Sequence, residues 1–228
     1  MTISIIIPVK KLEEAKSRLS PLLSTKQRRQ FCLEMLTDVL AAIKRAGYIR
    51  QTLVVSIDPT AHEIAKNFGA APFKESRPDL NQAATEATHR CIWRGARSVL
   101  ILPADIPLIT KEDLTQVLSV GKDVAVVISP SRNMEGTNGL FLTPPDILPL
   151  RYDPRSFQRH KREALVRRLR FRVLKSPRIA LDIDTIEDLT EFVALKGETH
   201  AHRFLVKEGI AERLGLEAHH RKVGGEII

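Results

Sequence analysis

One carboxylate in this sequence follows a short apolar run, at a position where it could bind a metal ion. Residues 99–102, Val-Leu-Ile-Leu, are typical of a buried strand, and Asp105 follows between Pro103 and Pro107. The two prolines stiffen the turn and so set the direction of the carboxylate. In α/β sheets, ligands bind at the carboxyl ends of the strands. A lone oxygen ligand there suits Mg²⁺, which prefers one or two protein carboxylates together with substrate phosphates.

A second acidic pair lies far along the chain, where Asp182 and Asp184 are separated by one residue. Residues two apart on an extended chain point the same way, so either carboxylate could join Asp105 on a metal ion. The alternative for Asp184 is a helix cap, because Glu187 follows at the spacing of a capping box. One residue can do both, so the two interpretations are not exclusive.

Basic residues follow the first apolar run, residues 3–9, in the segments Ile7-Pro-Val-Lys10 and Ala15-Lys-Ser-Arg-Leu19. A phosphate loop usually lies here, between the first strand and the first long helix. The segments lack the glycines of a P-loop, so phosphate contact would depend on side chains. The alternative is a solvated basic loop. The predicted nucleotide contacts are Pro8, Lys10, Lys16, Ser17 and Arg18.

Three other polar segments could complete a binding site. Asn81 could pair with a purine edge, or the segment could serve only to place Asp79 as a helix cap. The loop 135–139, Glu-Gly-Thr-Asn-Gly, could line an anionic pocket or form an ordinary hairpin turn. In the segment 153–157, Ser156 could donate to a phosphate or carboxylate at a helix start, or simply cap that helix.

Apolar runs and helical periodicities alternate along the chain, which predicts the elements that hold these residues. The predicted strands are 3–9, 52–57, 71–73, 99–102, 124–128, 139–142 and 171–174. The predicted helices are 24–46, 60–68, 80–95, 110–118, 156–169 and 184–195. A short connection without helical pattern precedes 139–142, so that strand is expected to be antiparallel. The alternation predicts a three-layer α/β fold with a mostly parallel sheet in residues 1–196, followed by a helical, partly flexible tail, 197–228.

The composition limits the classes of ligand and partner that this protein is expected to bind. The net charge of +9 suits a polyanionic ligand, but few aromatic residues interleave with the basic block 151–178, which argues against nucleic acid. No apolar run approaches the roughly 18 residues needed to cross a membrane, so no membrane partner is expected. Cys32 and Cys91 fall in predicted helices and are expected to be free thiols in a reducing cytoplasm. The histidines of the tail are expected to be solvated rather than metal-bound.

Taken in order, these segments resemble the 2-phospho-L-lactate guanylyltransferase family of the MobA-like nucleotidyltransferase superfamily. The matching segments run from about residue 3 to 195 and read IPVK with AKSRL, LNQA, PADIPLI, GTNGLFL, SFQRH and DIDTIEDL. The resemblance implies a Rossmann-like fold. It also implies transfer of GMP from GTP to 2-phospho-L-lactate, giving lactyl-2-diphospho-5′-guanosine and pyrophosphate in coenzyme F420 biosynthesis. Related acceptors would be phosphoenolpyruvate, 3-phosphoglycerate or a sugar phosphate.

The resemblance also implies roles for individual residues. Asp105, Lys16 and Arg18 would be catalytic, and Mg²⁺ would bind Asp105 with Asp184 or Asp182. The triphosphate would contact the basic loop, and Asn81 would contact the base. The acid would lie against Thr137, Asn138, Asp153 and Ser156. The family further suggests a homodimer, in addition to the cytoplasmic location expected from the free thiols.

Overall fold

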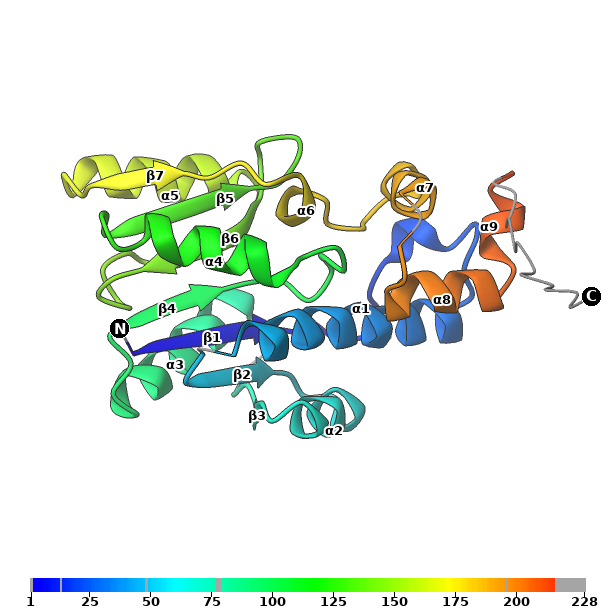
Figure 1. Ribbon diagram of the computed structural model, residues 1–228, viewed down its shortest axis with the longest axis horizontal. Coiled ribbons are helices and arrows are strands. Elements are labelled where there is room, and N and C mark those ends of the chain that lie inside the picture. The colour runs from blue at the N-terminus through cyan, green and yellow to red at the C-terminus, as the bar shows by residue number, and fades with distance from the viewer. Residues whose placement is uncertain (1, 13, 48, 77–78, 196, 216–228) are drawn as a thin grey trace, which may run out of the picture.

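The computed structural model describes residues 2–12, 14–47, 49–76, 79–195 and 197–215, and these residues form a seven-stranded sheet (Figure 1). The strand order is β3-β2-β1-β4-β6-β5-β7. The strands are β1 (Ile3–Pro8), β2 (Gln51–Val55), β3 (Ala71–Phe73), β4 (Ser98–Ile101), β5 (Val126–Pro130), β6 (Thr137–Leu142) and β7 (Phe171–Val173). Strand β6 runs antiparallel to β4 and β5, whereas the other pairs are parallel. The predicted mixed sheet is confirmed.

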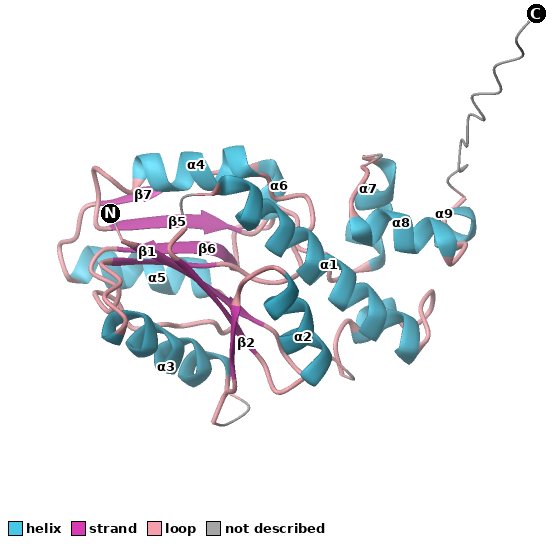
Figure 2. Cartoon of the chain, turned by 60° about the horizontal axis from the view of Figure 1, so that its bottom comes forward, coloured by secondary structure: helices cyan, strands magenta, loops and turns pink. Residues whose placement is uncertain are grey.

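Helices cover both faces of the sheet, as the three-layer prediction required (Figure 2). In β1, Ile5 and Ile7 are buried in the core shared with α1 and α4, and Ile6 is buried in the core shared with α3 and α5. Alternate residues of a strand point to opposite faces, so a strand buried on both sides is apolar throughout.

The helices are α1 (Thr25–Ala46), α2 (Pro59–Asn67), α3 (Leu80–Trp93), α4 (Lys111–Val120), α5 (Ser156–Val166), α6 (Pro177–Ala180), α7 (Ile186–Ala194), α8 (His200–Lys207) and α9 (Ile210–Arg213).

Several helix ends follow the residues that the sequence offers. Ser24 caps α1, Asp79 caps α3 by accepting from Gln82 N, and Thr110 forms the predicted capping box with Asp113 at the start of α4. These caps satisfy backbone N–H groups that have no partner within the helix. They fix where the loops of the site end and the helices begin.

Two predicted caps are wrong. Asp184 does not cap the helix that follows it, because Thr185 takes that position and forms a capping box with Asp188. Ser156 is already the first residue of α5, and the cap position belongs to Arg155, which has a left-handed backbone and makes no side-chain cap. Both Asp184 and Ser156 are therefore left free to point elsewhere.

The segment 197–215 shares the core of the preceding residues. Helix α8 packs alongside α1 beyond the end of the sheet (Figure 1), where Ala201 and Leu205 are buried in the same core as α1. Asp38 of α1 accepts hydrogen bonds from His200 N and Ala201 N and so ties down the start of α8. Residues 216–228, including the predicted flexible Gly224-Gly225, lie outside the described residues. Among the described helices, none combines the length and apolar character of a membrane span.

Candidate active site

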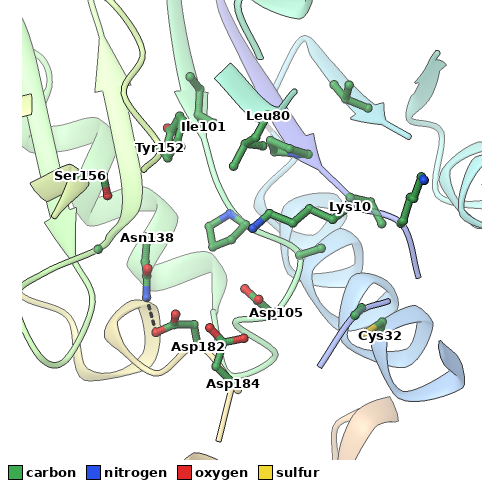
Figure 3. A pocket seen from close by; sticks show the side chains of 18 of the residues that line it. Lys10, Cys32, Leu80, Ile101, Asp105, Asn138, Tyr152, Ser156, Asp182 and Asp184 are labelled. Carbon is green, nitrogen blue, oxygen red and sulfur yellow. Dashed lines mark hydrogen bonds between the residues drawn. The ribbon is translucent and has the colours of Figure 1, made fainter. Parts of the chain in front are cut away.

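The carboxyl ends of β1 and β4 open into a pocket of about 910 Å³ (Figure 3). Because β6 runs the opposite way, its first residues meet the last residues of β4 at this edge of the sheet. The pocket brings together most of the predicted site residues: Pro8, Lys10, Lys16, Asn81, Asp105, Thr137, Asn138, Asp153, Ser156, Asp182 and Asp184. Ser17 and Arg18 do not line it, although Arg18 is close enough to help lower the pKa of Asp184.

Lys16 joins the two acidic segments. Its Nζ lies 2.5 Å from Asp105 Oδ2 and 2.5 Å from Asp184 Oδ1, and its side chain is only 6% exposed. Burial by itself lowers the pKa of Lys16, but the two carboxylates outweigh burial and raise it above its usual value. The backbone of Lys16 is left-handed (φ 55°, ψ 37°), a conformation that costs a side-chain-bearing residue about 1–2 kcal/mol. That strain is localised at a residue which aims an ammonium group at two acids.

Asp182 completes the acidic side of the pocket. Burial and then the neighbouring carboxylates Asp105 and Asp184 raise its pKa to about 6. Its Oδ1 accepts from Asn138 Nδ2 at 2.9 Å, and the same amide donates to Ile179 O at 3.0 Å. Asn138 was predicted to contact the acid substrate, but its amide N–H groups are used to hold Asp182 and the chain before it (Figure 3).

The acidic residues fit a divalent cation only in part. Ile183 N donates to Asp105 O at 3.1 Å, which fixes the segment that carries Asp182 and Asp184 beside Asp105. Asp105 Oδ1 is buried and has no hydrogen-bond partner among the described residues. Across those residues, no three His, Cys, Asp or Glu side chains are close enough together to hold a metal ion by themselves. The donors therefore fit Mg²⁺ held by one or two carboxylates and completed by substrate phosphates.

The opposite wall of the pocket carries two buried hydroxyl groups. Thr137 begins β6 and Ser156 begins α5, and Ser156 Oγ accepts from Thr137 N at 2.9 Å. Thr137 Oγ1 lies 3.0 Å from His160 Nδ1, one turn further along α5. Asp153 also lines the pocket, but its carboxylate lies 3.0 Å from Arg159 Nε, so it is already paired with a cation.

Asn81 and Tyr152 link α3 to the loop before α5. Asn81 Oδ1 accepts from Tyr152 N at 2.6 Å, so one of its two acceptor sites is used, and its N–H groups remain for a base. Tyr152 packs edge-on against His160, with ring centroids 5.3 Å apart. Its hydroxyl is buried in the pocket wall and has no hydrogen-bond partner among the described residues. Neither Tyr152 nor His160 was predicted as a site residue. His160 belongs to the matching segment SFQRH, but nothing local shows that its ring contacts Thr137.

Cys32 also lines the pocket, and it carries no evident chemistry. Both Cys32 and Cys91 are free and buried, as predicted. Burial raises the pKa of the Cys32 thiol to about 11, so the thiolate is a minor form at neutral pH. Cys32 therefore contributes packing rather than a nucleophile.

Known proteins match both the sequence and the fold. Residues 3–222 match the family model described as "Guanylyl transferase CofC like", which extends past the predicted boundary at 196. The phosphoenolpyruvate guanylyltransferase of Rubrobacter xylanophilus is 41% identical over 204 residues, covering 89% of this chain and 99% of that protein. The 2-phospho-L-lactate guanylyltransferase of Methanothermobacter thermautotrophicus is 40% identical over 204 residues, 89% of each chain.

Solved structures share the fold at low sequence identity. A candidate nucleotide-diphospho-sugar transferase from Desulfovibrio desulfuricans superposes with a TM-score of 0.76 at 16% identity, covering 93% of this chain and 98% of the other. A cytidylyltransferase from Leptospira borgpetersenii gives a TM-score of 0.59 at 18% identity, with 93% and 94% covered. These likenesses establish the Rossmann-like nucleotidyltransferase fold. From the family match and its relatives, the chain belongs to the CofC-like guanylyltransferases and is a nucleotidyltransferase.

Proposed function

We propose that this enzyme joins the GMP unit of GTP to the phosphate of a small phosphorylated carboxylic acid and releases pyrophosphate. The observation that carries the proposal is that different sides of one pocket carry different kinds of side chain. In Figure 3, Lys10 lies on the β1 side, the three aspartates lie together, and Ser156 lies on the far side. Lys16 reaches Asp105 and Asp184, and Thr137 is hydrogen-bonded to Ser156. A cationic side suits a triphosphate, and a wall of neutral hydroxyl donors suits a smaller anion.

The reaction needs charge neutralisation more than it needs a base. A phosphate monoester has a second pKa of about 6, so it is largely a dianion at neutral pH and can attack without losing a proton. Its oxygen would form a bond to the α-phosphorus of GTP, and the bond from that phosphorus to the bridging oxygen of pyrophosphate would break. Lys10 and Lys16 would offset the repulsion between the two anions, and one pocket would hold them in line.

We further propose Mg²⁺ as the metal, held by Asp105 with Asp184 or Asp182. When bound, it would neutralise phosphate charge and help to orient the transferring group. Lys16 pairs with both Asp105 and Asp184. The unpartnered Asp105 Oδ1 and the shared charge of the three carboxylates support a further cation at this place.

For the acid, we propose 2-phospho-L-lactate, with phosphoenolpyruvate as the alternative that the name of the Rubrobacter relative favours. Both acids carry a carboxylate on the carbon that bears the phosphate ester, so two hydroxyl donors could recognise either. With 2-phospho-L-lactate the product would be lactyl-2-diphospho-5′-guanosine, a step of coenzyme F420 biosynthesis. We also propose that the enzyme works as a cytoplasmic homodimer, a proposal that rests on the family resemblance.

The test is a pyrophosphate-release assay that pairs each nucleoside triphosphate with 2-phospho-L-lactate, phosphoenolpyruvate, 3-phosphoglycerate and a sugar phosphate. The reaction should run with GTP and one of the first two acids, and chelation of divalent cations should stop it. Release with a sugar phosphate alone would contradict the proposed acceptor, and equal rates with all four nucleotides would contradict selection of guanine. An unchanged rate after chelation would contradict the role of Mg²⁺.

A further inference from the structure

The hydrogen bonds around His160 determine which of its ring nitrogens carries the proton. His160 is fully buried on α5, and its Nε2 lies 3.0 Å from Arg151 N. A backbone N–H can only donate, so Nε2 must be the acceptor. Burial lowers the pKa of His160 to about 4, so the ring is neutral at physiological pH. The single ring proton therefore lies on Nδ1.

The position of that proton determines the role of the Thr137 hydroxyl. Nδ1–H donates to Thr137 Oγ1 across 3.0 Å, and in the described part of the chain this is the only hydrogen bond of that oxygen. The hydroxyl hydrogen of Thr137 is therefore still available. The hydroxyl hydrogen of Ser156 is also available, because Ser156 Oγ accepts from Thr137 N and makes no other hydrogen bond to the described residues. Thr137 and Ser156 both line the pocket, and each hydroxyl keeps its hydrogen to donate while one of its two acceptor sites is engaged.

The opposite tautomer would have the opposite effect. If Nε2 carried the proton, Thr137 would have to donate to Nδ1 and would turn lone pairs toward the pocket. Lone pairs repel a carboxylate or phosphate oxygen, whereas an O–H group attracts it. The orientation of Arg151 N is fixed in turn, because the next residue, Tyr152, is held by Asn81 Oδ1 at 2.6 Å. Asn81 thus supports the hydroxyl wall at a distance.

We propose that His160 is a positioning residue, which holds Thr137 as a hydrogen-bond donor to the acid substrate. This inference rests on the proposed function, since it assumes that an acid anion occupies the wall formed by Thr137 and Ser156. His160 does not touch the substrate. It acts through Thr137, and its effect should therefore appear in the affinity for the acid and disappear when Thr137 has no hydroxyl.

The kinetic test uses His160→Phe, His160→Asn, Thr137→Val and the double variant His160→Phe/Thr137→Val. His160→Phe should raise the KM of the acid about ten-fold or more and leave the KM of GTP within about two-fold, the scale of one lost hydrogen bond to a charged group. His160→Asn should recover part of the loss, because its amide can donate from a position near that of Nδ1. In the Thr137→Val background, His160→Phe should have little further effect. His89→Gln, exposed on α3, is the matched control.

Two kinetic outcomes would overturn the inference. Equal rises in the KM of both substrates would mean that His160 only maintains the fold, and a full effect in the Thr137→Val background would mean that it does not act through Thr137. A wild-type enzyme that releases no pyrophosphate with any acid would instead refute the proposed function. Long-range ¹H–¹⁵N NMR of the unliganded wild-type protein tests the tautomer separately. We expect a neutral ring protonated on Nδ1 at pH 7, and an Nε2-protonated ring or an imidazolium would overturn the inference.

Discussion

Asp105 is the residue at which loss of charge should affect the chemical step most. Asp105→Asn keeps the size of the side chain and removes its charge, and Asp105 faces both Lys16 and the other acids. We expect kcat to fall roughly 10²–10³-fold, the scale of losing one main electrostatic stabiliser. The measurement is pyrophosphate release at saturating substrates, with Glu112→Gln on the exposed start of α4 as control. Turnover near that of wild type would remove Asp105 from the mechanism.

Ser156 should affect binding of the acid. Ser156→Ala removes a pocket donor and also leaves Thr137 N without its acceptor, which costs about 1–3 kcal/mol of unfolding free energy. We expect the KM of the acid to rise more than the KM of GTP, because the lost donor lies on the hydroxyl wall. Steady-state kinetics with each substrate varied in turn measures this, and chemical denaturation measures the stability. A larger rise in the KM of GTP would show that the two sides of the pocket are misassigned.

Lys16 competes for the carboxylates that a metal would need. Lys16→Met would leave Asp105 and Asp184 without their ammonium partner. We expect Mn²⁺, used as a spectroscopic stand-in for Mg²⁺, to bind the nucleotide-free variant about ten-fold tighter than wild type. A ten-fold change is about 1.4 kcal/mol, which is modest beside the roughly 4 kcal/mol between unit charges near a protein surface. Electron paramagnetic resonance measures the affinity, with Lys111→Met as control. Equal or weaker binding would separate Lys16 from the metal site.

At the scale of elements, the predicted helices were correct in kind and less accurate at their ends. Thr110 and Asp113 predicted the start of α4 because a capping box is local in sequence. For α7, two boxes overlapped, and Thr185 with Asp188 formed in place of Asp184 with Glu187. The Asp184 carboxylate lies instead against Lys16, which comes from a distant part of the chain. Local spacing alone could not distinguish the two.

Asp113 also links elements, and the sequence did not indicate this. Its buried carboxylate accepts from Ser176 Oγ at 2.8 Å and Arg178 Nε at 2.6 Å, so it joins α4 to α6, just before Asp182. Asp113→Ala should lower the unfolding free energy by about 2–3 kcal/mol, since several donors lose a charged acceptor. Urea denaturation measures the change, and Glu112→Ala is the adjacent exposed control. A loss below about 0.5 kcal/mol would show that α6 is held by other contacts.

At the scale of the whole molecule, His160 should make stability depend on pH. Its pKa lies near 4 when folded and near 6.5 when unfolded, so between these values the unfolded chain binds more protons. The stabilisation is therefore complete above about pH 6.5 and is lost as pH falls toward 4, by roughly 3 kcal/mol. Unfolding free energies at pH 7 and 4.5 should differ less in His160→Phe than in wild type. The same difference in both proteins would contradict a neutral buried ring.

The sequence predicted the layers and the order of most elements, and most of the site residues that it predicted line the pocket. It did not predict which of these residues pair. Lys16 and Asp184 are 168 positions apart, and Asn138 and Asp182 are 44 apart, so neither contact has a local pattern. Such pairs form only once the sheet has brought its strand ends to one edge. The hydrogen bonds of Asn138 and Asn81 within the chain escaped prediction for the same reason, because an amide suits a ligand and a neighbouring loop equally well.

The antiparallel direction of β6 affects how the specificity of this enzyme for its acid substrate could evolve. Because β6 runs against its neighbours, the hydroxyl wall begins on β6 and ends on α5, a continuous stretch from 137 to 160, while the lysines belong to the loop after β1. On the proposed assignment, the two reactants are served mainly by different stretches of chain, although Asn81 and Tyr152 link them through a hydrogen bond. Exchange of one acid for another would then require substitutions mainly in that stretch, and the lysines that face the nucleotide could be inherited unchanged.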